Sequence, residues 1–122
     1  MGKTVLVIDD EAGYRALLSS DLSKIGYSVL TAASGDGAIK ILEKTKVDCA
    51  ITDMQMRPMD GLDTITAIRK TWATLPIILM TGYAIEERVS QALTMRVGGF
   101  LRKPFAIHEM RSTIKNLIET EV

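Results

Sequence analysis

Short apolar runs of strand length alternate along this chain with longer segments in which apolar residues recur every three or four positions. The first run, Thr4–Ile8, is continuously apolar, as is typical of a strand buried on both faces of a parallel sheet. Further short runs predict strands at 27–31, 48–53, 77–80 and 100–102.

The segments between these runs have the spacing of amphipathic helices. The first helix follows the polar residues after Ile8 and ends before Gly26, a residue type that is common just after a helix. The second begins after Ser34, a favoured N-cap, and reaches Leu42. The same periodicity predicts helices at 62–72, 85–96 and 107–119.

Strands that alternate with helices predict a parallel sheet with right-handed crossovers and helices on both faces. At this length the natural closure is an α/β fold of the flavodoxin-like (βα)5 class, a doubly wound sandwich with a five-stranded parallel sheet. We expect residues 1–122 to form a single domain. Each helix should turn an apolar stripe toward the sheet, and these stripes include Tyr14, Leu17, Leu93 and Ile107.

Polar side chains stand where four of the five predicted strands end. Asp9 and Asp10 follow the first strand, Asp53 closes the third, Thr81 follows the fourth and Lys103 follows the fifth. The carboxyl ends of parallel strands meet at one edge, where open α/β sheets bind their ligands. Taken alone, Asp53 fits a structural role, as a strand terminator or a helix cap, as well as it fits a binding site. The side chains at all four strand ends together predict a site.

Three clustered carboxylates repel one another unless a cation compensates their charge. An all-oxygen ligand set suits a hard cation, and Mg²⁺ needs few carboxylates because it keeps several of its waters. The chain has no zinc pattern: we expect His108 to be a surface residue of the last helix and Cys49 a packing residue of the third strand. The predicted cofactor is therefore Mg²⁺.

A carboxylate beside Mg²⁺ and a lysine is arranged for phosphoryl transfer, which depends mainly on neutralising the charge of the phosphoryl oxygens. In this interpretation Asp53 is the nucleophile and forms an acyl phosphate. Lys103 and the metal supply positive charge, and Thr81 donates a hydroxyl hydrogen bond. A flavin site is disfavoured, because the acidic residues after the first strand would repel a phosphate.

Composition and charge narrow the class of protein further. The chain has 122 residues with 15 basic and 15 acidic side chains, so no general nucleic-acid or membrane surface is predicted. It has no apolar run of about 18 residues and no secretory leader pattern. The single cysteine fits a reducing compartment. We expect a cytoplasmic domain that binds neither nucleic acid nor membrane directly.

The motifs at the strand ends, in this order and spacing, resemble the receiver domain of two-component response regulators. The resemblance covers essentially the whole chain, and although no single motif is specific, the set is highly specific. The motifs are Ile8-Asp9-Asp10-Glu11, Asp53 followed by Met59-Asp60-Gly61, Thr81-Gly82, and Lys103-Pro104-Phe105.

The resemblance implies a role for each matching residue at the site. Asp53 corresponds to the phosphoacceptor, Asp10 to the direct Mg²⁺ ligand and Asp9 to its water-bridged partner. The backbone carbonyl of Gln55 corresponds to the third metal-ligand position, and Lys103 to the lysine that pairs with the phosphate.

The resemblance also implies a switch and partners. Thr81 matches the switch hydroxyl and Phe100 the rotating aromatic, so phosphorylation should alter the fourth helix, the fifth strand and the fifth helix. That face is the expected site of partner binding or homodimer formation. The phosphoryl group should come from a sensor histidine kinase or a phosphotransfer protein. The domain is then a signalling phosphoacceptor rather than an enzyme, and catalyses its own phosphotransfer and autodephosphorylation.

Departures from the family pattern leave one alternative open. Proline usually lies four residues after the phosphoacceptor, where this chain has Arg57, and Phe100 lacks the hydroxyl of the common tyrosine, so any switch there must be steric. An aspartate-nucleophile phosphatase would want a second aspartate where Gln55 stands. The alternative is a receiver-like interaction module that is not phosphorylated, which the retention of Asp53 and Lys103 disfavours.

Overall fold

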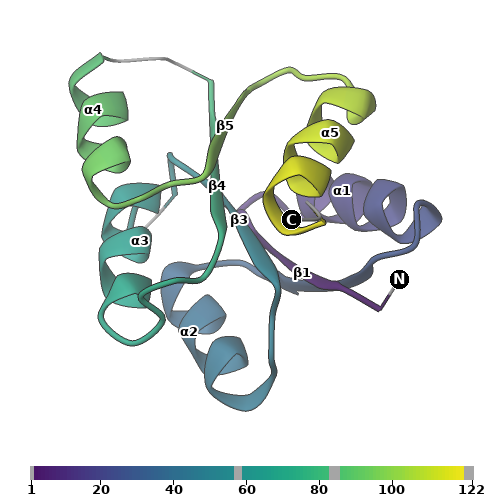
Figure 1. Cartoon of the computed structure of the whole chain (residues 1–122), viewed down its shortest axis with the longest axis horizontal. Coiled ribbons are helices and arrows are strands. Elements are labelled where there is room, and N and C mark those ends of the chain that lie inside the picture. Colours follow the sequence, from purple (N-terminus) through teal and green to yellow (C-terminus); the bar gives the residue numbers. More distant parts are fainter. Residues whose placement is uncertain (1, 57–58, 83–85, 120–122) are drawn as a thin grey trace.

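The computed structural model describes residues 2–56, 59–82 and 86–119, with side chains throughout these ranges except at 86–89. Arg57 and the predicted start of the fourth helix at residue 85 lie outside the described residues. Strands and helices alternate as predicted (Figure 1). They are β1 (Thr4–Ile8), α1 (Ala12–Lys24), β2 (Ser28–Ala32), α2 (Gly35–Lys44), β3 (Cys49–Asp53), α3 (Gly61–Arg69), β4 (Ile77–Thr81), α4 (Glu86–Thr94), β5 (Gly99–Arg102) and α5 (Ile107–Ile118).

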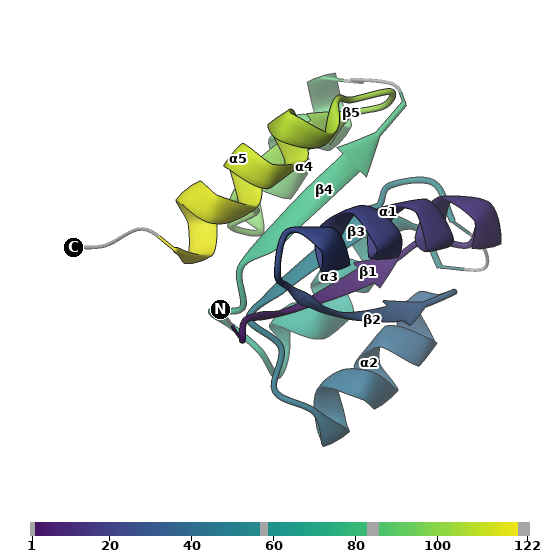
Figure 2. The ribbon, with the colours of Figure 1, turned by 90° about the vertical axis from the view of Figure 1, so that its right-hand side faces the viewer.

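The strands form one parallel sheet in the order β2-β1-β3-β4-β5. Figure 2 looks onto the side covered by α1 and α5, and its strand arrows point the same way. This arrangement confirms the doubly wound, flavodoxin-like α/β class. No helix in the described ranges combines the length and the apolar character needed to cross a membrane.

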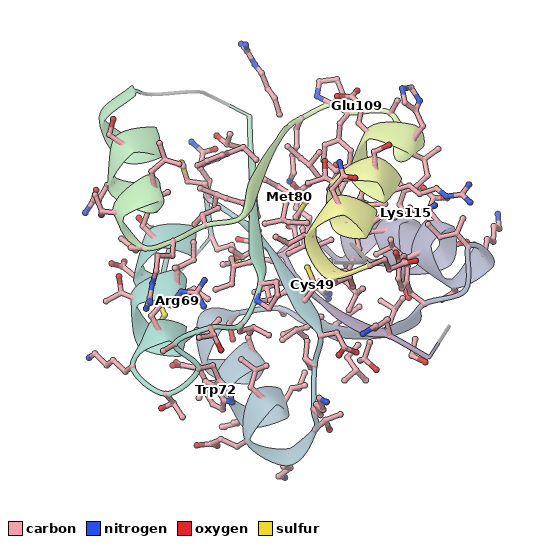
Figure 3. The ribbon with its side chains drawn as sticks, in the orientation of Figure 1. Cys49, Arg69, Trp72, Met80, Glu109 and Lys115 are labelled. Carbon is pink, nitrogen blue, oxygen red and sulfur yellow. The ribbon has the colours of Figure 1, made fainter. Side chains whose placement is uncertain are left out.

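The two faces of the sheet carry separate hydrophobic clusters, because successive strand residues point to opposite faces. We call these the α1/α5 side and the α2–α4 side (Figures 1 and 2). Figure 3 shows Cys49 and Met80 on the α1/α5 side. That side also contains Val5, Val7, Ile51, Ile78, Leu18, Leu22, Met110 and Ile114. The α2–α4 side contains Leu6, Ile8, Ala50, Ile77, Leu79, Ala38, Leu42, Leu62, Ile65, Ile68 and Ala92.

Local signals at two helix ends act as the sequence predicted. The Ser34 hydroxyl accepts a hydrogen bond from the backbone N–H of Gly37 at 3.1 Å and so caps α2. Gly26, just past α1, has a φ of 104°, a left-handed conformation that glycine adopts without a steric penalty. The two signals thus mark where α2 begins and where α1 ends.

The predicted apolar stripes are wrong at three positions. Leu17, Leu93 and Ile107 are 53%, 56% and 42% exposed. Successive helical residues are rotated by about 100°, so when Leu18 faces the sheet its neighbour Leu17 points to the flank, and Leu93 stands in the same relation to the buried Ala92. Ile107 is the first residue of α5, where the helix has only begun to cover the sheet.

Arg69 joins the C-terminal ends of α3 and α4 (Figure 3). Its guanidinium donates hydrogen bonds to the carbonyls of Met95 and Arg96 at 3.0 and 3.1 Å, just beyond α4. It also donates to the carbonyls of Trp72 and Leu75 at 3.0 and 2.6 Å, just beyond α3. Burial, followed by the charge of Arg96, lowers the pKa of Arg69. One side chain therefore donates to four carbonyl groups of the two segments that follow these helices.

We expect Arg69→Met to lower the free energy of unfolding by about 2 kcal/mol, because three partly buried hydrogen bonds and one exposed hydrogen bond of the guanidinium are lost. Urea denaturation monitored by circular dichroism measures this change. Arg111→Met, at an exposed position of α5, is the matched control and should change stability by less than about 0.5 kcal/mol. Equal stability of the two variants would contradict the role assigned to Arg69.

Candidate functional site

The strand ends converge at the carboxyl edge of the sheet as the sequence predicted. Asp9 and Asp10 directly follow β1, Asp53 is the last residue of β3, and Thr81 is the last residue of β4. Lys103 directly follows β5. Because β1, β3, β4 and β5 are successive neighbours in the sheet, these side chains come from one contiguous stretch of its edge.

The carboxylates of Asp9, Asp10 and Asp53 form a cluster in which the contributed oxygens all lie within 4.8 Å of one another. Asp9 is fully buried, Asp53 is 6% exposed and Asp10 is exposed. A ligand would thus meet protein oxygens on one side and solvent on the other. An open, all-oxygen set of this kind fits a hard cation such as Mg²⁺, which binds through few carboxylates and keeps several waters.

Lys103 lies between two of these carboxylates. Its ammonium is 3.1 Å from an oxygen of Asp9 and 3.2 Å from an oxygen of Asp53. Burial alone lowers the pKa of Lys103, but hydrogen bonds and charge attraction from Asp9 and Asp53 outweigh it, and the pKa is raised. Lys103 is therefore a fixed positive charge beside the Asp53 carboxylate.

The Asp53 carboxyl is held in an environment that disfavours its ionised form. Burial raises its pKa most; Lys103 lowers it, and the charges of Asp9 and Asp10 raise it again, so that the pKa is raised overall. Lys103 compensates only part of the negative charge at this edge. A cation bound by the same carboxylates would remove the remaining repulsion.

The chain after Asp53 is packed tightly against the strand end by Gly61. The Gly61 N–H donates to the carbonyl of Met54 at 2.7 Å. A Cβ at position 61 would lie 2.4 Å from the carbonyl oxygen of Asp53, so only glycine fits. Asp60 accepts a hydrogen bond from the N–H of Asp63 at 2.9 Å and caps α3. The Asp60-Gly61 pair thus begins a helix directly beside Asp53, and the exposed Gln55 lies in the loop between them.

Thr81 and Phe100 lie on neighbouring strands. Thr81 is buried, and its carbonyl accepts a hydrogen bond from the N–H of Lys103 at 2.8 Å. Phe100 pairs in register with Leu79, two residues before Thr81 on β4, and packs partly buried against the α2–α4 side. A backbone hydrogen bond thus connects Thr81 to Lys103, and the pairing of β4 with β5 places Phe100 beside Leu79, two residues before Thr81.

Sequence reasoning missed two residues of α1 that contact the site. The Arg15 guanidinium donates to the carbonyl of Asp9 at 2.7 Å, and the N–H of Glu11 donates to the Asp9 carboxylate at 2.9 Å. The ring of Tyr14 lies beneath the ammonium of Lys103. The sequence assigned Tyr14 to an apolar stripe, and its only signal was its place one helical turn after the Asp-Asp pair.

Comparisons with known proteins agree with this geometry. The family model for the response regulator receiver domain matches residues 5–115. The alkaline phosphatase synthesis transcriptional regulatory protein PhoP of Bacillus subtilis is 31% identical over 97% of this chain and 49% of its own length. The chain spans about half the length of this relative and 26% of the transcriptional regulatory protein GlrR of Escherichia coli.

Solved structures give the same result. The chemotaxis protein CheY4 of Vibrio cholerae has a TM-score of 0.92 and 28% identity, covering 96% of this chain and 99% of that one. The response regulator TrrA of Thermotoga maritima, solved in complex with Mg²⁺ and BeF, has a TM-score of 0.83 and 32% identity, covering 94% and 98%. With the fold, the edge cluster and the family match in agreement, the chain belongs to the response regulator receiver domain family of two-component systems.

Proposed function

We propose that residues 1–122 form one phosphoacceptor receiver domain that takes a phosphoryl group onto Asp53. The donor is a sensor histidine kinase or a phosphotransfer protein in the cytoplasm. The observation that carries this proposal is the position of the Asp53 carboxylate, 3.2 Å from the Lys103 ammonium and within the three-carboxylate cluster. An isolated strand terminator would need neither a lysine partner nor two further carboxylates.

The chemistry assigns one task to each side chain. An Asp53 oxygen attacks phosphorus, the bond from phosphorus to the donor breaks, and Asp53 carries an acyl phosphate. Lys103 pairs with the developing charge on the phosphoryl oxygens, and Thr81 donates its hydroxyl to one of them. Attack of water on the same phosphorus later returns the free carboxylate, which is autodephosphorylation.

The carboxylate cluster is the proposed Mg²⁺ site. Asp10 and Asp53 would bind the metal directly with the backbone carbonyl of Gln55, and Asp9 would act through a water. When bound, Mg²⁺ neutralises charge on the phosphoryl oxygens. The support in this chain is the clustering of the three carboxylates and the raised pKa of Asp53. The TrrA structure, which contains Mg²⁺ and BeF, is consistent with such a site.

The first test is phosphorylation of the isolated chain by acetyl phosphate with Mg²⁺. Intact-mass measurement should show one added phosphoryl group, and Asp53→Asn should abolish it. Lys103→Met should slow it by about a hundredfold, the typical cost of removing one group that stabilises transition-state charge. Asp63→Asn, an exposed aspartate on α3, is the matched control and should react like the wild type. An Asp53→Asn protein that is still modified would show that another residue is the acceptor, and a wild type that gains no phosphoryl group would support the unphosphorylated interaction module.

The second test uses the pH dependence of stability. A pKa raised by folding means that the folded protein binds a proton at Asp53 more tightly than the unfolded chain, so this contribution stabilises the fold at low pH and is lost as pH rises through the folded-state pKa. Without divalent cations, Asp53→Asn should therefore have a higher Tm than the wild type at pH 7, and the difference should shrink toward pH 4.

Mg²⁺ should reverse the order of the two Tm values, so that the wild type is more stable than Asp53→Asn at pH 7. At ten times its Kd it should stabilise the wild type by about 1.4 kcal/mol, and it should stabilise Asp10→Asn much less. Calorimetric scans with and without the metal measure both effects. A Tm of Asp53→Asn below that of the wild type at pH 7 without metal would show that the Lys103 ion pair outweighs the repulsion.

We further propose that phosphorylation is transmitted to the surface formed by α4, β5 and α5, which would bind a partner or a second copy of the chain. Thr81 would move toward the phosphoryl group, and Phe100, beside Leu79 in the register, would respond. A hollow of about 330 Å³ next to Phe100, lined by residues of β5 and α5, belongs to this surface. Phosphoryl contacts need only differ by a few kcal/mol between two states to shift the population.

The third test adds beryllofluoride and Mg²⁺ and follows amide chemical shifts by NMR. In the wild type the changes should extend from Asp53 to α4, Phe100 and α5. Thr81→Ala should bind the analogue but lose most of the changes at Phe100. Analytical ultracentrifugation of the same samples reports homodimer formation. Changes limited to the loops around Asp53 in both proteins would contradict the proposed coupling.

A further inference from the structure

Tyr14 presents its ring to the site lysine. The Lys103 ammonium lies 4.1 Å from the centroid of the Tyr14 ring, well within the range of a cation–π interaction. The same ammonium contacts Asp9 at 3.1 Å and Asp53 at 3.2 Å. Two carboxylates and one aromatic face thus define where this charge lies.

The ring is itself held in place. Phe105 packs edge-on against it, with 6.2 Å between centroids and an interplanar angle of 84°. Tyr14 and Phe105 both border the hydrophobic cluster of the α1/α5 side, and Tyr14 is only partly exposed. Phe105 follows Lys103 by two residues, so the Tyr14 ring is fixed by the same loop that carries the lysine.

The ring acts differently from a third carboxylate. A lysine ammonium sits on a flexible four-carbon stem and can occupy many positions around its partners. The Tyr14 ring attracts the ammonium but is neutral, so it restricts the position without cancelling the charge. A tyrosine hydroxyl is neutral at physiological pH, and burial, ahead of the charges around it, raises the pKa of the Tyr14 hydroxyl further.

We propose that Tyr14 is a positioning residue for Lys103, holding the ammonium where it meets a phosphoryl group on Asp53. This inference rests on the proposed function. When Asp53 carries a phosphoryl group and Asp9 takes part in cation binding, both carboxylate partners of Lys103 are changed, whereas the Tyr14 ring is not. It is then the unchanged contact that directs the ammonium toward the phosphoryl oxygens.

The experiment compares the wild type with Tyr14→Phe and Tyr14→Leu. The first readout is the NMR shift of the Lys103 side-chain methylenes nearest the ammonium, without phosphorylation. The ring current should be kept in Tyr14→Phe and lost in Tyr14→Leu. Tyr27→Leu is the matched control: it removes a tyrosine that borders the same cluster but bonds Glu119, and it should leave the Lys103 shift unchanged.

The second readout is the rate of phosphorylation by acetyl phosphate with Mg²⁺. Tyr14→Leu should slow it by about 2- to 30-fold, the range of a cation–π contact, while Tyr14→Phe should retain the wild-type rate. In a Lys103→Met background Tyr14→Leu should have no further effect. Tyr14→Met replaces the leucine variant if the latter does not fold.

The outcomes separate the two proposals. Three results would each overturn the role of the ring. The first is that Tyr14→Leu slows phosphorylation equally with and without Lys103, and the second is that the Lys103 shift is unchanged in Tyr14→Leu. The third is that Tyr14→Phe is phosphorylated slowly. A wild-type protein that gains no phosphoryl group on Asp53 would overturn the proposed function. In that case the Lys103 shift would establish the contact with the Tyr14 ring but not its purpose. The positioning role would therefore be overturned as well.

Discussion

The carboxyl edge of the sheet carries more negative than positive charge, and the arrangement of the site depends on this imbalance. The Lys103 ammonium bridges Asp9 and Asp53, and Asp10 adds a third carboxylate to the same cluster. Burial strengthens the repulsion because it removes the solvent that would screen it, and the pKa of Asp53 is raised. A site that keeps such unrelieved repulsion is suited to bind a cation and then an anion beside it.

The scaffold holds these charges together through rigid contacts made just behind them. Gly61 lets α3 begin against the Asp53 carbonyl, where a Cβ would be 2.4 Å away. Arg15 and the N–H of Glu11 fix the backbone and carboxylate of Asp9. Behind these contacts, β3 and β4 are buried along their whole length, so the strand ends have little freedom to move apart. The packing of the hydrophobic core on both sides of the sheet therefore offsets the repulsion between the carboxylates.

Much of this was predictable from the sequence, for a physical reason. Continuously apolar strands such as Thr4–Ile8 imply burial on both faces, and in a parallel sheet the residues after such strands must meet at one edge. Asp9, Asp53 and Lys103 could be grouped on that basis, before any contact was known. The strand order was not predictable, because periodicity describes each strand by itself and does not say which strands are neighbours.

The errors share a different cause. Leu17 and Leu93 were assigned to the core because spacing alone defines a stripe, whereas burial depends on how a helix is rotated over the sheet. Tyr14 was assigned to the same kind of stripe, and its contact with Lys103 joins residues 89 positions apart that no local pattern connects. Arg69 presents the same difficulty, since it bonds carbonyl groups just beyond α4, 26 and 27 positions away in the sequence.

Arg69 also bears on the proposed coupling between the site and the surface formed by α4, β5 and α5. It fixes the carbonyls of Met95 and Arg96, which lie between α4 and the start of β5. The opposite end of β5 is tied to Thr81 through the N–H of Lys103, and Phe100 lies between these two points. In the proposed coupling, a displacement of Thr81 would thus act on a strand whose far end is held by Arg69. Its effect would enter β5 at Lys103, next to the Tyr14 ring, and would reach Phe100 before the end of the strand that Arg69 holds.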